Sequence, residues 1–178
     1  MMSTSGGGKA LRQPPVMHQE IAEWRKLGTV DDLTSDRLRR LAGMWADRCG
    51  PGDRLPGRGD FSARDLIALG GIVSLLDIVS EDPLRLRFRL VGTHVSQTLG
   101  RDSTGWYLDD LYRAEFMPLV LEPYRLCVQS RAPVSSSGRL KPVPKDFIAH
   151  QSLDLPLASD GRTIDMILKG SILQGGPP

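Results

Sequence analysis

Residues 84–111 read LRLRFRLVGTHVSQTLGRDSTGWYLDDL, and this stretch decides the fold. In its first seven residues, leucine or phenylalanine alternates with arginine without a break, which is the period of a β-strand with one buried face. After Gly92 the pattern changes to short helical or irregular pieces, punctuated by Gly100 and Gly105. Because glycine tolerates positive φ, Gly92 and Gly100 are expected where the strand gives way to a helix and where that helix ends. The stretch therefore predicts one strand followed by short helices.

On either side of this stretch the chain contains further strand patterns and one longer helix. The longer helix is predicted from about Glu115 to Ser130, with a bend at Pro123, since proline removes an internal backbone hydrogen bond. Ser62 and Asp65 form a capping-box pattern that predicts a short helix ending at Gly70–Gly71. The predicted strands are Ile72–Val79, Leu84–Leu90, Val134–Val143, Phe147–Leu157 and Thr163–Leu173. The predicted order is two strands, several helices and three strands.

The N-terminal third carries two helical patterns. One covers His18–Leu27, with Ile21 and Trp24 on one stripe, and a clearer one begins after Ser35. The expected organisation is a disordered tail over residues 1–15, N-terminal helices and a connector over 16–60, a core domain over 61–173 and a disordered tail over 174–178.

Composition excludes several classes of protein. With 23 basic and 21 acidic residues the net charge is only +2, so nucleic-acid binding by long-range attraction is not expected. No apolar run approaches the roughly 20 residues of a membrane-spanning helix. Two distant cysteines form no disulfide framework or zinc ribbon, and the N-terminus lacks the apolar core of a secretory signal, so a cytoplasmic protein is expected.

The junction after the alternating strand resembles a bacterial, mostly stand-alone PAS-like family. The positions that carry the resemblance are Val91-Gly92-Thr93, Gly100-Arg101-Asp102, Thr104-Gly105, Leu108 and Leu111, together with the upstream Trp45, Leu55-Pro56, Arg58 and Asp60-Phe61. The resemblance covers about Leu38 to Leu173 and implies an α/β (α+β) fold. That fold is a five-stranded antiparallel sheet with helices packed on one face, here with additional N-terminal helices.

The resemblance also implies where a ligand would lie, between the concave face of the sheet and the helices. The residues expected to line that pocket are Phe88, Leu90, Tyr124, Cys127, Met166 and Leu168. The same residues would also form a filled hydrophobic core. Gln151 is expected to point inward as well, and a buried amide needs a hydrogen-bond partner that a ligand or water could supply.

No particular cofactor is predicted, and the two best-known candidates, flavin and haem, are disfavoured. A flavin photosensor of the light-oxygen-voltage type needs a reactive cysteine in an Asn-Cys-Arg-Phe motif, which residues 100–103 do not provide. Haem needs an axial histidine on the long helix, and Glu115–Ser130 contains none. The spacing of His18, His94 and His150 matches no metal site.

No catalytic motif is present. Cys127, His150 and Asp154 can be drawn as nucleophile, base and orienting acid, but such a trio can be drawn in almost any sequence. The chain has no nucleophile elbow, oxyanion-hole glycine run or phosphate loop. Catalysis is therefore not predicted, and Cys127 is interpreted as a small buried hydrophobe.

Two surfaces are candidates for docking a partner. Arg85, Arg87 and Arg89 form a basic stripe that is either paired with acidic residues within the chain or open to an acidic partner. The N-terminal helix that carries Leu38, Leu41 and Trp45 is the candidate for homodimerisation.

The leading hypothesis is a sensory or signalling module that binds a small molecule, a partner protein or both. Because the sequence contains no output domain, the module is expected to act in trans on an unidentified signalling protein and to form a homodimer. The alternative is a structural adaptor with a filled core and no ligand.

Overall fold

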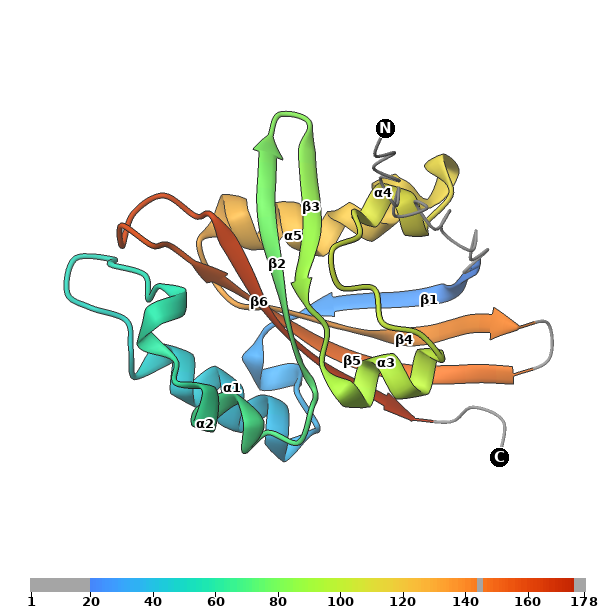
Figure 1. Cartoon of the computed structure of the whole chain (residues 1–178), viewed down its shortest axis with the longest axis horizontal. Coiled ribbons are helices and arrows are strands. Elements are labelled where there is room, and N and C mark those ends of the chain that lie inside the picture. Colours follow the sequence, from blue (N-terminus) through green and yellow to red (C-terminus); the bar gives the residue numbers. More distant parts are fainter. Residues whose placement is uncertain (1–19, 144–145, 175–178) are drawn as a thin grey trace, which may run out of the picture.

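The computed structural model describes residues 20–143 and 146–174, and its centre is a six-stranded antiparallel sheet (Figure 1). The strands lie in the order β1-β4-β5-β6-β2-β3. Their bounds are β1 Glu20–Gly28, β2 Val73–Glu81, β3 Leu84–Leu90, β4 Val134–Val143, β5 Asp146–Leu157 and β6 Met166–Gln174. The α+β fold class is confirmed, with one strand more than predicted.

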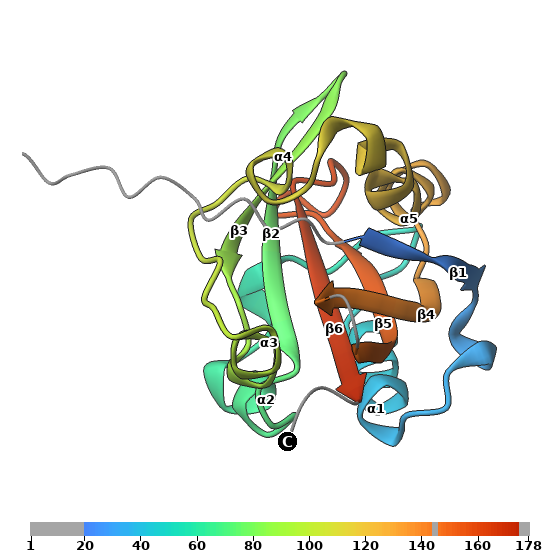
Figure 2. The ribbon, with the colours of Figure 1, turned by 90° about the vertical axis from the view of Figure 1, so that its right-hand side faces the viewer.

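The helices cover both faces of this sheet. Their bounds are α1 Asp36–Ala46, α2 Ala63–Ile67, α3 Thr93–Leu99, α4 Leu108–Leu111 and α5 Met117–Ser130, with 3-10 turns at Val30–Asp32, Arg58–Asp60 and Ala114–Phe116. On one face, which we call the inner face, α5 contacts β4 and β5, α3 contacts β6, and α4 contacts β3. On the other, the outer face, α1 contacts β5 and β6. Figure 2 shows α5 and α1 on opposite sides of these strands.

The additional strand is β1, and it replaces the helix predicted over His18–Leu27. The prediction was wrong because helix formers within a short segment give only a marginal helix in the absence of packing. The segment instead pairs antiparallel with β4, for example Lys26 with Ser137 and Gly28 with Ser135. Backbone hydrogen bonds along the edge of β4 therefore override the local helical preference.

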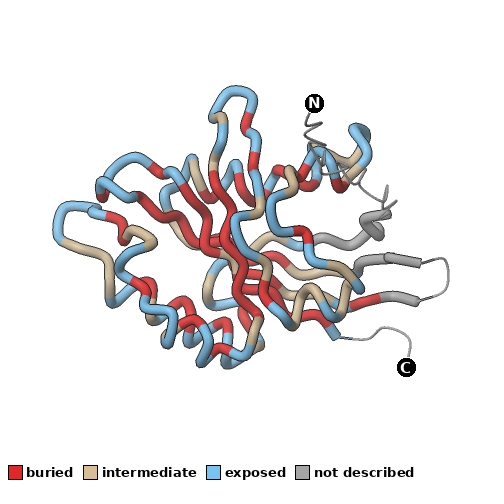
Figure 3. Tube along the Cα trace, viewed as in Figure 1, coloured by how far each residue is buried: buried red, intermediate tan, exposed pale blue. Residues whose placement is uncertain are grey.

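Helix α1 buries its apolar side against the outer face of the sheet. Leu38 and Leu41 are fully buried, and Trp45 donates its indole N–H to the carbonyl of Pro156 at 2.9 Å. The contact is close enough that a Cβ added to Gly170 would lie 2.6 Å from Leu38 Cδ2. Buried residues accordingly run along the central strands and the facing side of the helices (Figure 3). The prediction that Leu38, Leu41 and Trp45 form a dimer interface is corrected, since core packing leaves these side chains no surface to offer.

The ends of two helices test the predictions made from capping residues and glycines. The Ser62 and Asp65 capping box is confirmed, because the Ser62 hydroxyl accepts the Asp65 N–H at 3.1 Å and the Asp65 carboxylate accepts the Ser62 N–H at 3.0 Å. Gly100 ends α3 with φ of +70°, as expected. Gly92 differs, because its φ is −63° and its role is to let strand and loop backbones approach each other.

Some boundary predictions fall outside the described residues. The tail predicted over 1–15 lies outside them, as do residues 175–178 of the predicted C-terminal tail. Gln174, predicted to begin that tail, is the last residue of β6.

Candidate functional site

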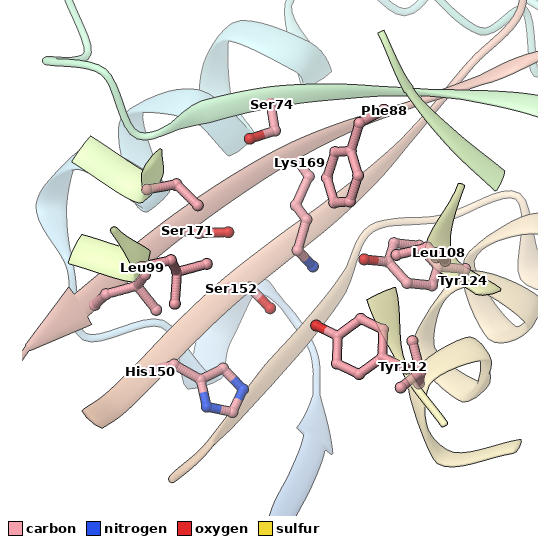
Figure 4. Close-up of a pocket in the computed structure, with 13 residues that line it drawn as sticks. Ser74, Phe88, Leu99, Leu108, Tyr112, Tyr124, His150, Ser152, Lys169 and Ser171 are labelled. Carbon is pink, nitrogen blue, oxygen red and sulfur yellow. The ribbon is translucent and has the colours of Figure 1, made fainter. Parts of the chain in front are cut away.

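A cavity of about 110 Å³ lies between the inner face of the sheet and helices α3, α4 and α5 (Figure 4). Its apolar walls are Phe88, Val95, Leu99, Leu108, Val120 and Leu173. Its polar groups are Ser74, Tyr112, Tyr124, His150, Ser152, Lys169 and Ser171. The location agrees with the pocket position that the resemblance implied, between the sheet and the helices.

The central feature of the cavity is a buried ion pair between two adjacent strands. Lys169 on β6 and Asp154 on β5 are direct cross-strand partners, and Lys169 Nζ lies 2.8 Å from Asp154 Oδ1. The Asp154 side chain is 0% exposed, and its Oδ2 atom has no hydrogen-bond partner among the described residues. Lys169 Nζ also lies 4.9 Å from the centre of the Tyr124 ring, which is a cation–π distance. The sheet therefore presents a positive group to the cavity, while its counter-charge lies beside it on the neighbouring strand and outside the cavity lining.

Hydroxyl groups surround the lysine. Figure 4 shows the hydroxyls of Tyr112, Tyr124 and Ser152 directed toward the space into which Lys169 Nζ points. Ser152 Oγ lies 2.7 Å from Ser136 Oγ, and Ser74 Oγ accepts the Gly92 N–H at 3.3 Å. Ser74, Ser136 and Ser152 come from three strands, β2, β4 and β5, so the sheet register fixes their relative positions, whereas Tyr112 follows α4 and Tyr124 lies on α5.

The structure brings only part of the predicted pocket together. Phe88 and Tyr124 line the cavity. Met166 and Leu168 are buried in the core but do not line it, and Leu90 is 45% exposed beside Leu75 at the end of β3. For Met166 and Leu168 the difference arises from strand parity, because neighbouring residues of a strand face opposite sides of the sheet and Lys169 and Ser171 occupy the inner positions of β6.

Gln151 also lies on the outer face, where it holds the start of α1. Its Oε1 atom accepts the N–H groups of Thr34 and Ser35 at 2.9 and 3.2 Å, and its Nε2 donates to the carbonyl of Asp32 at 3.3 Å. The amide thus finds its partners within the chain. The expectation that Gln151 faces the pocket is corrected by the same parity, since His150 and Ser152 on either side of it line the cavity.

Sequence reasoning missed Lys169 and the three cavity serines. One signal was available: Lys169 stands in the middle of the strongly apolar run of β6, where a charge needs a buried partner. Serines at alternating strand positions carry a weaker signal, because they are equally common on exposed faces.

The basic stripe on β3 is paired within the chain. Arg87 and Arg89 both contact Asp77, at 3.0 and 2.6 Å, and Arg85 lies 3.0 Å from Asp109 and stacks on the Tyr107 ring. Of the two interpretations left open by the sequence, the structure shows internal pairing. The three side chains remain 44–57% exposed, so their outer edges are still accessible to solvent.

The structure does not assemble a nucleophilic trio from Cys127, His150 and Asp154. Cys127 is fully buried, lies outside the cavity lining and donates its thiol to the backbone carbonyl of Asp154 at 3.5 Å. Burial, and then the Asp154 charge, raise the pKa of the Cys127 thiol far above its ordinary value. A thiol held in the protonated form is a poor nucleophile.

Thiol reactivity tests this placement. We expect Cys49, which is half-buried, to react with a disulfide reagent in the native protein, and Cys127 to react about tenfold more slowly or only after unfolding. Burial also raises the pKa of the Cys49 thiol, so its reaction will be slower than that of a free thiol. The measurement is a colorimetric thiol titration with and without denaturant. In the Cys49→Ser variant the native signal should disappear; a rapid remaining signal would contradict the burial of Cys127.

Metal sites and membrane-spanning helices are both missing from the described part of the chain. Across residues 20–143 and 146–174, no set of three or more His, Cys, Asp or Glu side chains is placed to hold a metal ion. Within the same ranges, every helix is too short or too polar to cross a membrane.

An antiparallel sheet that carries a cavity beneath a group of short helices and one longer helix is the arrangement of a PAS-like α+β domain. The family model described as a PAS domain matches residues 33–172, and the chain therefore belongs to the PAS domain family. The matched range includes α1, which the sequence had placed before the core domain. Searches of curated proteins and of solved structures gave no match. As a PAS domain, the chain falls within a class of sensory and signalling modules.

Proposed function

We propose that this protein is a sensory module that binds a small molecule in the cavity between the inner face of the sheet and α3, α4 and α5. The occupied state is read by a partner protein, and the module works as a homodimer. These finer statements go beyond family membership and rest on the chemistry of the cavity.

The observation that carries the proposal is the position of Lys169. A charged side chain in the middle of a core strand costs free energy to bury, and its partner Asp154 offsets only part of that cost. Packing alone would be served equally well by an apolar side chain at this position. Its ammonium group instead points into a space bounded by hydroxyls, which is typical of ligand sites with few, convergent polar groups in an apolar surround.

Native mass spectrometry of the full chain tests the proposal. We expect a bound small molecule, released on unfolding, and the mass of a dimer. Ser171→Leu should abolish the bound mass, because the larger apolar side chain fills the cavity and removes a hydroxyl. Ser130→Leu is the matched control: the same exchange at the exposed end of α5, away from this cavity, should leave the bound mass unchanged.

Two results would count against the proposal. One is an empty protein after expression in several hosts, combined with no thermal stabilisation by a small-molecule library. The other is an identical bound mass in Ser171→Leu, which would place the ligand elsewhere.

A further inference from the structure

The cavity is rich in hydrogen-bond donors. Of the three ammonium N–H groups of Lys169, one is directed at Asp154 Oδ1 and the ring of Tyr124 lies near another. Lys169 Nζ has no other hydrogen-bond partner among the described residues. Ser171 Oγ makes no hydrogen bond to a described residue, and the Ser74 hydroxyl, which already accepts from Gly92, retains its own proton to donate. A ligand that fits these groups must supply acceptors.

The cavity is also poor in negative charge. No aspartate or glutamate is among its lining residues. Asp154 lies beside Lys169 on the neighbouring strand and balances that single charge. Arg101 does not line the cavity, but it follows Leu99 of the cavity wall by two residues, and its Nε and Nη1 atoms are buried without a hydrogen-bond partner among the described residues. The cavity therefore offers a ligand positive and neutral donor groups but no acidic side chain, which favours an anion over a cation.

Size and the apolar walls restrict the rest of the ligand. An engineered apolar cavity of roughly 150 Å³ holds benzene, so a space of about 110 Å³ suits a compact body of about five or six non-hydrogen atoms. Val95, Leu99 and Val120 form an apolar wall, which suits a short hydrocarbon chain.

We propose that the ligand of this cavity is a short-chain monocarboxylate, with its carboxylate at Lys169 and the serine hydroxyls and its hydrocarbon part against the apolar wall. This inference rests on the proposed sensory function and names the ligand class. A carboxylate supplies acceptors and a single negative charge together, and its hydrogen bonds to an ammonium group are stronger than those of a neutral carbonyl.

Titration calorimetry of the unmodified full-length protein with three probes of matched shape tests the ligand class. Butyrate should bind about tenfold or more tightly than butyramide, and butylamine should not bind. Across acetate, propionate, butyrate and hexanoate, affinity should rise to a maximum near butyrate and fall at hexanoate, because the cavity volume limits the chain.

Two variants tie the preference to the proposed residues. Asp154→Asn combined with Lys169→Met removes both members of the ion pair together and should abolish the preference for butyrate over butyramide. Arg101→Gln should weaken butyrate binding several-fold. Arg125→Gln removes an exposed arginine on α5 and should leave binding unchanged.

The outcomes separate the ligand class from the function. If butyramide binds as well as butyrate, or if the purified protein retains a neutral molecule that Ser171→Leu loses, the cavity is a ligand site but the carboxylate inference is wrong. If no probe binds and the purified protein is empty in every host, the proposed sensory function fails together with the inference.

Discussion

Replacing Lys169 with methionine is expected to lower the free energy of unfolding by about 3–5 kcal/mol, the usual cost of removing one partner of a buried ion pair. The substitution leaves the Asp154 carboxylate fully buried on the neighbouring strand. Asp154 Oδ2 already has no hydrogen-bond partner among the described residues, so the deletion of Lys169 would remove the ion pair of the remaining oxygen. Urea unfolding followed by circular dichroism measures the loss.

The loss of stability should arise from the unpaired Asp154 carboxylate and not from the absence of the lysine itself. Asp154→Asn together with Lys169→Met should recover most of the lost stability, because no uncompensated charge is left. Lys26→Met supplies the matched control. Lys26 pairs with Asp32 at 3.3 Å while 75% exposed, so the same exchange there should cost far less. Equal losses at the two lysines would contradict the buried character of the Lys169 pair.

The second large effect is expected at Gly92, where alanine should lower the free energy of unfolding by about 3 kcal/mol through overpacking. A Cβ at this position would collide with the carbonyl oxygen of Gly71 and lie 2.6 Å from that of Val73. Both obstacles are backbone atoms, which cannot turn aside as the end of a side chain can. The shift must also disturb α3, whose first turn includes the hydrogen bond from Ser96 N–H to the Gly92 carbonyl.

The matched control for Gly92→Ala is Gly43→Ala. Gly43 lies in the middle of α1, and an added Cβ there meets no atom within 4 Å. Alanine should therefore stabilise α1 by about 0.5–1 kcal/mol. In a chain of this size, a loss of about 3 kcal/mol corresponds to a melting temperature lowered by roughly 6–12 °C. A melting temperature of Gly92→Ala at or above that of the unmodified protein would contradict the close contact between Gly92 and the backbone of Gly71 and Val73.

The sequence specified most of the sheet because alternation and turn chemistry act locally. Strand β3 was predicted with the bounds that it has, and β4 likewise. Strand β1 was missed because its pairing is with residues more than a hundred positions away, and its own composition favours a helix. The local pattern of residues 18–27 contains no information about the distant edge of β4 with which β1 pairs.

The cavity was predicted in place and only partly in composition. Its position follows from the order of elements, which the sequence contains. Its residues depend on which face each strand position occupies, and a single-residue error exchanges the two faces. Gln151, Met166 and Leu168 were assigned to the inner face, whereas the inner positions of β5 and β6 belong to Ser152, Lys169 and Ser171.

Strands β5 and β6 separate the cavity from α1 by the thickness of one backbone. Ser171 borders the cavity, while Gly170 before it lies against α1. Consecutive codons thus specify residues on two different surfaces of the protein. Selection can alter what the cavity accepts without touching how α1 is seated, and it can reshape the α1 side while leaving ligand preference intact. A scaffold with this property can acquire new signals by single substitutions and keep the rest of its architecture.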